Sequence, residues 1–215
     1  MNSQPIALIH AVGHAHVADL DALLDFVNSE SYSDGEPEEH LPTVDDAVAW
    51  FAQRGLAHED ALREQAMREG EASWLARMHA NRAALREVWD AQVEHRMPDR
   101  GALDTVNAVL REAPRIELIP GDGCCGIGHR HTADDLTGEA LARVVQPLVD
   151  AIAGGDTGRF RICANDGCRW VFEDTSRAGR RRWCDISSCG NRAKVRRYRS
   201  RHKAEHPAGA VEPAR

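Results

Sequence analysis

The sequence predicts a mainly α-helical domain with one β-hairpin, an α+β arrangement, followed by a small zinc-bound finger that ends in a basic helix. Apolar residues recur at helical spacing through most of the first 112 positions. Polar and apolar side chains then alternate around a turn sequence, as in a hairpin. Paired cysteines and a dense run of arginine follow near the end of the chain. We expect the helical domain over residues 1–153, a linker over 154–158, the finger over 159–204 and a disordered tail over 205–215.

Size and composition are those of an ordinary soluble protein. The 215 residues are 42% hydrophobic and 28% charged. No apolar run is long enough to cross a membrane, and the first residues, MNSQPIALIHAV, lack the basic start and cleavage site of a signal peptide. We therefore expect a cytoplasmic protein with no membrane partner. In that compartment paired cysteines are more often metal ligands or redox groups than disulfides.

The helical domain divides at turn and capping residues. A short helix is expected over residues 17–28, followed by a loop over 31–42 that is rich in Gly, Pro and acidic side chains. Thr43 has the features of an N-cap for the next helix, which ends near Gly55. Further helical patterns cover residues 58–69, 71–96 and 99–112.

A β-hairpin and a last helix complete this domain. The segment RIELI at 115–119 alternates like a half-buried strand, PGDG is turn chemistry, and CCGIGHRHT can return as the second strand. The last helix is capped by Asp134 or Asp135 and runs to about Ile152. A second metal site in the hairpin is an alternative to ordinary hairpin residues. Its ligands would be Cys124, Cys125, His129 and His131.

Charge is divided unevenly along the chain. Residues 159–215 hold fifteen Arg and Lys against six Asp and Glu, a net charge of +9, whereas residues 1–158 carry −16 and the whole chain −7. Such asymmetry is typical of a basic module that meets a polyanion. The alternative is that the two parts attract each other, so that the acidic domain masks the basic one.

The remaining cysteines form two C-x4-C pairs separated by fifteen residues, Cys163 with Cys168 and Cys184 with Cys189. This layout is typical of a four-thiolate zinc site, because each pair forms a tight knuckle whose sulfurs reach one ion. The segment has few bulky apolar residues, whereas a structural zinc contributes on the order of 10–16 kcal/mol. We predict one structural Zn²⁺, since four cysteines leave no position open for water. A redox-active pair would favour C-x-x-C spacing instead.

The run after Cys189, GNRAKVRRYRSRHK, lacks proline and suits a helix. Val195, Tyr198 and His202 are spaced to pack onto the zinc knuckle, while basic residues line both flanks. The zinc would thus pin a cationic helix to a rigid base, which suits it to gripping phosphates. The candidate nucleic-acid contacts are Arg180, Arg181, Arg182, Arg192, Lys194, Arg196, Arg197, Arg199, Arg201 and Lys203.

Residues 161–203 resemble the CGNR zinc finger. The resemblance is carried by the two C-x4-C pairs, by DTSR at Asp174–Arg177, by RRWC at Arg181–Cys184 and by CGNR at Cys189–Arg192. The preceding part resembles the ABATE-type domain found before this finger in bacterial proteins, on LLDFVNS at 23–29 and the hairpin-then-helix pattern at 115–152. The resemblance implies four zinc-binding cysteines, a DNA-binding role and a place among stress-induced transcription regulators.

These observations leave three binding functions open. In a transcription regulator the finger binds DNA, and the helical domain self-associates or senses a small molecule in a pocket that Trp50, Trp74 and Trp89 could line, although these suit a core as well. Alternatively the finger binds RNA, or it is a protein-interaction module. The sequence shows no nucleophile–base arrangement, no phosphate-binding glycine loop and no G-x-S-x-G motif, so we do not expect an enzyme.

Overall fold

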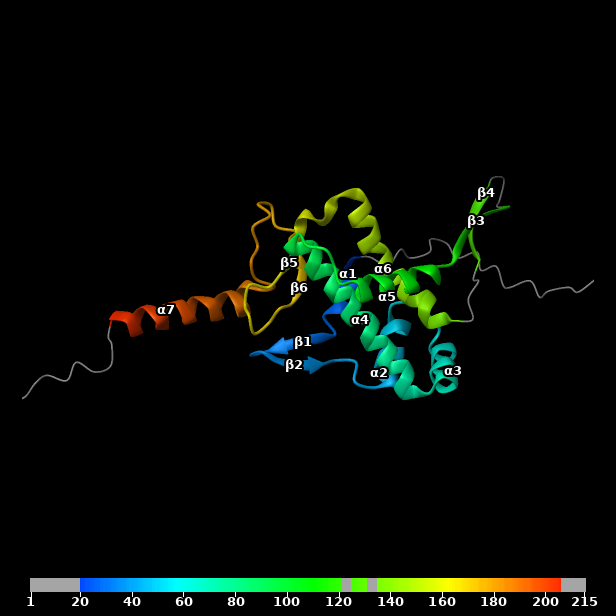
Figure 1. Cartoon of the computed structure of the whole chain (residues 1–215), viewed down its shortest axis with the longest axis horizontal. Helices are drawn as coiled ribbons and strands as arrows, with labels where there is room; N and C mark the ends of the chain where they lie inside the picture. Colours follow the sequence, from blue (N-terminus) through cyan, green and yellow to red (C-terminus); the bar gives the residue numbers. More distant parts are fainter. Residues whose placement is uncertain (1–19, 121–124, 131–134, 206–215) are drawn as a thin grey trace, which may run out of the picture.

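The computed structural model describes residues 20–120, 125–130 and 135–205 (Figure 1). The start of the first predicted helix and residues 206–215 of the predicted tail lie outside these residues. The elements are α1 (Leu20–Val27), β1 (Glu30–Ser33), β2 (Glu36–Glu39), α2 (Val44–Gln53), α3 (Glu59–Glu69), α4 (Glu71–Glu94), α5 (Arg100–Arg111), β3 (Arg115–Pro120), β4 (Cys125–Arg130), α6 (Leu136–Gly154), η1 (Asp156–Arg159), β5 (Phe160–Ile162), β6 (Val171–Glu173), η2 (Ile186–Gly190) and α7 (Asn191–Glu205).

The mainly helical class is confirmed, and capping residues define the helix starts that the sequence indicated. Thr43 forms a capping box with Asp46 at the start of α2. Asp135 is the N-cap of α6, because its carboxylate accepts the backbone N–H of Gly138 at 2.9 Å. Helix α4 ends at His95, whose φ of 53° lies in the left-handed region and turns the chain toward α5.

Helix α4 runs through the middle of the helical domain and packs against α1, α2, α3 and α5 (Figure 1). Trp74 and Trp89 on α4 are fully buried, and Trp50 on α2 belongs to the same core. The indole N–H of Trp74 donates to Thr137 Oγ1 of α6 at 2.8 Å. A buried indole needs such a partner, since an unpaired N–H costs about 1–3 kcal/mol. These tryptophans therefore hold α4 within the core.

Residues 30–39, most of which belong to the loop predicted over 31–42, form an antiparallel hairpin. Asp34 and Gly35 at its tip have φ values of 52° and 93°, as a type I′ turn requires, so the Asp-Gly pair was a hairpin signal in the sequence. Strand β2, with the sequence EPEE, is acidic and contains proline, so it has little strand propensity of its own. Buried Arg82 of α4 anchors them by donating to Ser29 and Glu39. Because these partners are distant along the chain, local patterns did not reveal the anchor.

The predicted hairpin is present as β3–β4, with Ile116 opposite His129 and Leu118 opposite Ile127. It projects from the helices at the end of the molecule away from α7 (Figure 1). The side chains of Ile116 and Leu118 are 71% and 77% exposed. The expectation that this strand is half-buried is therefore wrong, because no described element packs over its apolar face.

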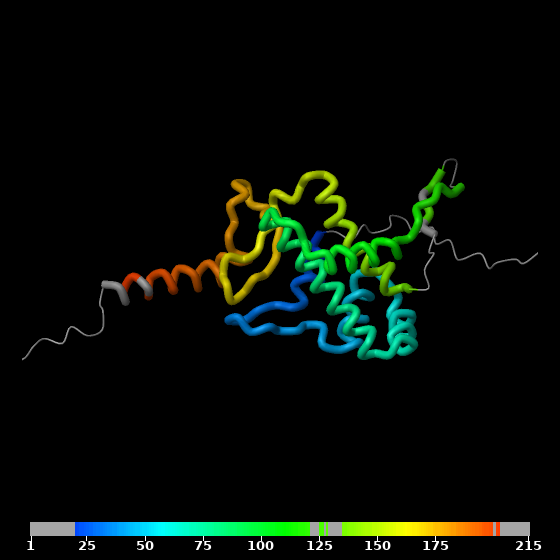
Figure 2. Tube along the Cα trace, viewed as in Figure 1, coloured from blue at the N-terminus to red at the C-terminus, as the bar shows by residue number. Residues whose placement is uncertain are grey.

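The residues predicted as a linker are structured, and they lead directly into the core. Helix α6 ends at Gly154, and η1 turns the chain into β5. Phe160 of β5 stacks on Trp89 of α4, and Val171 of β6 is fully buried in the same apolar cluster. The tube view shows this yellow and orange segment against one end of α4 (Figure 2). The first strands of the finger thus share the hydrophobic core of the helical domain.

Candidate metal centre and basic helix

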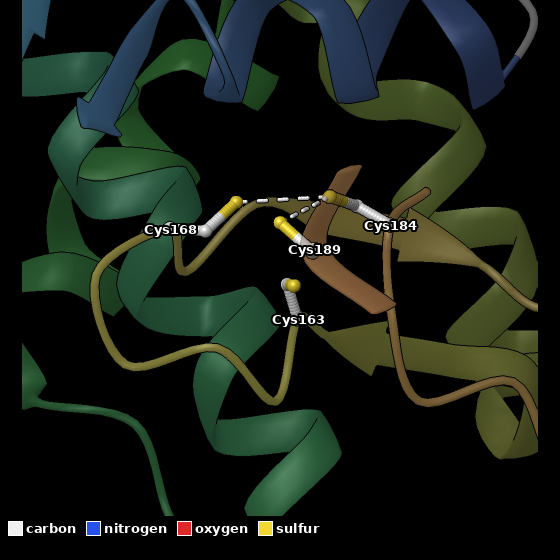
Figure 3. A group of neighbouring side chains, drawn as sticks. All are labelled: Cys163, Cys168, Cys184 and Cys189. Atoms are coloured by element: carbon white, nitrogen blue, oxygen red, sulfur yellow. Dashed lines mark hydrogen bonds between the residues drawn. The ribbon is translucent and has the colours of Figure 1, made fainter. Parts of the chain in front are cut away.

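The four paired cysteines converge on one point (Figure 3). Their sulfur atoms all lie within 4.8 Å of one another. Cys184 Sγ is 3.6 Å from Cys168 Sγ and 3.7 Å from Cys189 Sγ. Sulfurs on a tetrahedral zinc, with Zn–S bonds of about 2.3 Å, stand about 3.8 Å apart. The cluster has the size and composition of a four-thiolate site, and it holds one structural zinc.

Backbone hydrogen bonds shape the first knuckle. The N–H of Cys163 donates to the carbonyl of Trp170 at 2.8 Å, which extends the β5–β6 pairing up to the first ligand. The N–H of Cys168 donates to the carbonyl of Asn165 at 2.8 Å and closes the turn between the two sulfurs. Arg169 follows with a φ of 52°, so the chain reverses directly after the second ligand. Both sulfurs are therefore presented by one tight turn.

A capped helical turn shapes the second knuckle. Asp185, next to Cys184, accepts the backbone N–H of Ser188 at 2.8 Å and is the N-cap of η2. This turn carries Cys189, which is buried, and runs without a break into α7. The two knuckles are joined where the N–H of Ala164 donates to the carbonyl of Arg182 at 2.8 Å. The metal ligands thereby fix where the basic helix begins.

The thiols of this cluster need a cation to ionise together. Burial raises the pKa of Cys168 to about 11 and also raises the pKa of Cys184 above its usual range. Burial would raise the pKa of Cys189 too, but hydrogen bonds led by the Asn165 amide outweigh burial and lower it. That amide lies 3.6 Å from Cys189 Sγ. A bound divalent ion supplies the charge that lets four thiolates share this volume.

Two buried polar residues support the ligands, and the spacing of the cysteines did not single them out. Asn165 is 6% exposed and links the Cys189 sulfur to the Arg196 guanidinium, which lies 3.2 Å from Asn165 Oδ1. Asp174, 1% exposed, accepts the backbone N–H groups of Ser176 and Arg181 at 3.0 and 2.8 Å. These bonds order the loop that leads to Cys184. In the sequence only their positions indicated a role, because Asn165 lies between the first two cysteines and Asp174 begins the DTSR segment.

Asn28 of the helical domain clamps the finger. Its side chain donates to the carbonyl of Val171 at 2.9 Å and accepts the N–H of Val171 at 2.9 Å, as a neighbouring strand would. Trp89 adds a bond from its indole N–H to the carbonyl of Arg161 at 3.2 Å. Arg86 donates to the carbonyl of Arg169 at 2.8 Å. Both strands of the finger are therefore held by side chains of the helical domain.

The tip of the β1–β2 hairpin contacts the first zinc knuckle. The N–H of Gly35 donates to the carbonyl of Gly167 at 3.2 Å. A Cβ atom at Gly167 would stand 3.2 Å from the backbone of both Asp34 and Gly35, so only glycine permits this approach without a shift. Asp34 Oδ1 also lies 3.6 Å from the guanidinium of Arg192 at the start of α7.

Three of the predicted nucleic-acid contacts also contact other residues of the protein. Arg181 donates to the carbonyls of Trp183 and Cys184, and its guanidinium lies 4.8 Å from the centre of the Phe172 ring. Arg196 bonds to Asn165, and Arg192 lies beside Asp34, as described above. Arg181 thereby holds the loop that leads to the second knuckle, and Arg196 ties α7 to the first knuckle.

Most of the other predicted contacts are exposed. Helix α7 extends away from the helical domain, so the acidic domain does not cover it (Figure 1). The exposed residues are Arg180, Arg182, Lys194, Arg197, Arg199 and Arg201. Their side chains make no ion pair with any described residue. The side chain of Lys203 lies outside the described residues.

The apolar stripe of α7 does not pack onto the zinc knuckle as we expected. Val195 is 48% exposed and Tyr198 is 58% exposed. The ring of Tyr198 instead contacts the ring of His202, with centroids 4.4 Å apart. The reason is the direction of the helix, because α7 extends away from the rest of the molecule (Figure 1).

The alternative of a second metal site in the hairpin stays a prediction. Cys124, His131 and the side chain of His129 lie outside the described residues. Cys125 is exposed and lies apart from the other described cysteines. Within the described part of the chain, the cluster of four cysteines is the group that could hold a metal ion.

Fold and site define a zinc-binding protein in which a helical domain buttresses a four-cysteine finger. The ABATE family model, described as a putative stress-induced transcription regulator, matches residues 20–155, and the CGNR zinc finger model matches residues 159–202. The chain belongs to the ABATE family and carries a CGNR zinc finger. No curated protein matches it. None of the helices in the described segments is long and apolar enough to span a membrane.

Proposed function

We propose that this chain is a cytoplasmic transcription regulator that binds DNA through α7 of its zinc finger. The observation that carries the proposal is the exposure of the basic side chains of α7 on a helix anchored at one end by the zinc ligands. Arginine pairs well with phosphate, and a rigid base lowers the entropy lost when the helix docks. The family description points in the same direction.

The charge distribution supports a polyanionic partner. The finger and tail carry +9 on a chain of net charge −7, and the described basic side chains of α7 beyond Arg196 have no acidic partner among the described residues. Each phosphate contact releases counterions, so affinity should fall steeply with salt. The RNA-binding and protein-interaction alternatives remain outcomes of the experiments below. We assign the chain a binding role and not a catalytic one.

The helical domain, on this proposal, senses a signal or associates with a second copy. An open polar hollow between α3, α4 and the start of α6 is a candidate place for a small molecule, and it is lined by Gln65, Arg68, Glu69, Arg77 and Asp135. Arg77 already pairs with Glu69 at 2.8 Å and Asp135 at 2.9 Å, so a ligand would have to exchange these pairs. A signal there could travel along α4, which contacts both the hollow and β5.

Fluorescence anisotropy of a labelled random-sequence DNA duplex tests the proposal. We expect the zinc-loaded full chain to bind, with log affinity falling linearly with log salt, and to lose binding after chelation. The double variant Arg197→Ala, Arg199→Ala should bind more weakly and reduce the salt slope by about 2, because each phosphate contact contributes about 1. Absence of binding at low salt would overturn the proposal.

A matched control separates local contacts from net charge. Arg111, in the last turn of α5, and Arg115 on β3 are exposed, and β3 lies at the end of the molecule away from α7 (Figure 1). The double variant Arg111→Ala, Arg115→Ala removes the same charge and should leave the salt slope unchanged. An equal loss in both double variants would mean that binding depends on net charge alone.

A further inference from the structure

Three residues form an exposed ridge along α7: Val195, Tyr198 and His202, at positions i, i+3 and i+7. A helix turns about 100° per residue, so these positions lie within about 60° of one another on one face. The contact between the Tyr198 and His202 rings holds the two side chains together. An exposed Val–Tyr–His ridge on a helix this rich in arginine is a candidate contact surface.

The helix is held from the side away from this ridge. Ala193 is partly buried near the knuckle, and Arg196 reaches Asn165 beside the zinc ligands. By the same helical rotation Ala193 lies opposite the ridge, and Arg196 lies on one flank, roughly 130° from the centre of the ridge. The anchor therefore leaves the ridge facing solvent. Docking on the ridge requires no rearrangement of the finger.

Basic residues flank the ridge on both sides. One row holds Arg199 and Lys203, preceded by Arg192 and Arg196, whose guanidinium groups already contact Asp34 and Asn165. The other row holds Lys194, Arg197 and Arg201. Each row is centred about 100° around the helix from the ridge. A central ridge between two cationic rows matches a groove whose floor carries hydrogen-bonding and apolar edges and whose two walls are phosphate chains.

We propose, resting on the nucleic-acid binding proposed above, that the ridge enters the major groove of duplex DNA and that Val195, Tyr198 and His202 contact base edges. The B-form major groove is about 12 Å wide and admits a helix, whereas the A-form groove of duplex RNA is too deep and narrow. The ridge spans seven residues, about 10 Å, or about three base pairs. Val195 and the Tyr198 ring suit thymine methyl groups, while the Tyr198 hydroxyl and the His202 ring suit polar base edges.

Charge argues against a second copy of α7 as the partner of the ridge. Two such helices packed ridge to ridge would bring their arginine rows together, and like charges at short distance repel. No acidic residue interrupts these rows, because residues 186–204 contain neither Asp nor Glu. A duplex supplies negative charge on both sides of the ridge at once.

Selection from a pool of random 20-base-pair DNA duplexes tests this assignment with the zinc-loaded full chain. We expect the unaltered protein to enrich a short motif of about three base pairs. Tyr198→Ala and Val195→Ala should lose or change that motif, with a drop of about 5- to 100-fold in preference for the selected duplex over the random pool. Arg197→Ala should weaken binding to all duplexes and keep the motif, because phosphate contacts carry no sequence information.

Controls keep folding, base contact and phosphate contact apart. Zinc content and helix content should be unchanged in Tyr198→Ala, since the side chain is exposed and remote from the core. Met67→Ala on α3 removes an equally exposed side chain, 58% in both cases, and should keep the motif. Duplex RNA of the same length should compete poorly.

Each other result would overturn the assignment in a distinguishable way. If the unaltered protein binds with a normal salt slope but enriches no motif, or if Tyr198→Ala and Val195→Ala both keep the motif, the ridge does not read bases although the proposed function stands. If duplex RNA competes as well as DNA, groove insertion is excluded. If no duplex binds at low salt, the assignment falls together with the proposed function.

Discussion

The indole of Trp89 and the ring of Phe160 are stacked, with centroids 3.9 Å apart and planes inclined by 16°. Trp89 belongs to the longest helix of the ABATE domain, and Phe160 is the first residue of the first strand of the finger. Both side chains are at most 2% exposed. Two segments that match separate family models therefore meet inside one core, and this contact carries consequences for stability.

Trp89→Ala should destabilise both parts of the protein together. Removing a large buried aromatic costs about 3–5 kcal/mol, and the indole bond to the Arg161 carbonyl is lost as well. Urea unfolding of cobalt-substituted protein measures this, with circular dichroism for the helices and thiolate–cobalt absorption for the finger. Both signals should shift to lower urea and stay coincident. A cobalt signal that keeps its midpoint while the helices melt earlier would contradict a shared core.

Asn28→Ala should cost about 2–4 kcal/mol. It leaves the N–H and the carbonyl of Val171 buried without the partners that Asn28 supplies, and each unpaired buried group costs about 1–3 kcal/mol. Asn28→Asp should not restore stability, because a carboxylate cannot donate to the carbonyl. Urea titration measures both. Asn107→Ala, an exposed position on α5, is the matched control and should change stability by less than about 0.5 kcal/mol. Equal effects at the two positions would be inconsistent with the clamp.

Gly167→Ala should loosen the β1–β2 hairpin from the zinc knuckle. The new Cβ atom would stand 3.2 Å from the backbone of the hairpin tip, so the tip must move and the bond from the Gly35 N–H lengthens. We expect a loss of about 1–2 kcal/mol and faster hydrogen exchange at Gly35. Gly158→Ala is the control, because its Cβ atom would meet nothing within 4 Å. Unchanged exchange at Gly35 in Gly167→Ala would show that the tip is not held by this contact.

Cys184→Ser should abolish stoichiometric zinc binding, whereas Cys125→Ser should leave one zinc per chain. Cys184 lies within the four-sulfur cluster, and Cys125 is exposed and outside it. Elemental analysis of the purified variants measures the metal content. Because the finger shares its core with the helices, Cys184→Ser should also lower the melting temperature followed at helix wavelengths. Retention of one zinc by Cys184→Ser would place the metal elsewhere.

Acid should remove the contribution of Glu87 to stability. Hydrogen bonds from Arg96, then from the backbone N–H of Asp99, lower the pKa of Glu87 to about 2. The folded-state pKa lies below the unfolded value of about 4.5, so the stabilisation is present above that pH and is lost as the pH falls toward 2. The difference in stability between the unaltered protein and Glu87→Gln should be on the order of 1 kcal/mol at pH 7 and should vanish near pH 2. Zinc release in acid affects both proteins equally and therefore cancels in the comparison. A stability difference between the two proteins that does not change with pH would contradict this role of Glu87.

Predictions from residue spacing were correct where the structure depends on residues close together in the chain. The four zinc ligands follow from two local turns, and the helix starts at Thr43 and Asp135 follow from capping chemistry. The β1–β2 hairpin was missed although its Asp-Gly tip was visible, because the acidic strand β2 has low intrinsic propensity and Arg82 anchors the hairpin from α4. The exposed faces of β3 and α7 were misjudged for the opposite reason. Apolar spacing shows that residues share a face, and it does not show that another element covers that face.

Local patterns in the chain were enough to predict the helical class, the four metal ligands and the basic helix, since these depend on residues close together in the chain. Tertiary packing settled which arginines remain available to a partner. Arg181 and Arg196 are used by the finger itself, while Arg197 and Arg199 are exposed. It also decided that finger and helices share one core, through the bonds of Asn28 to Val171, 143 positions away. Such contacts depend on how distant segments pack, and one chain's local patterns carry no record of that packing.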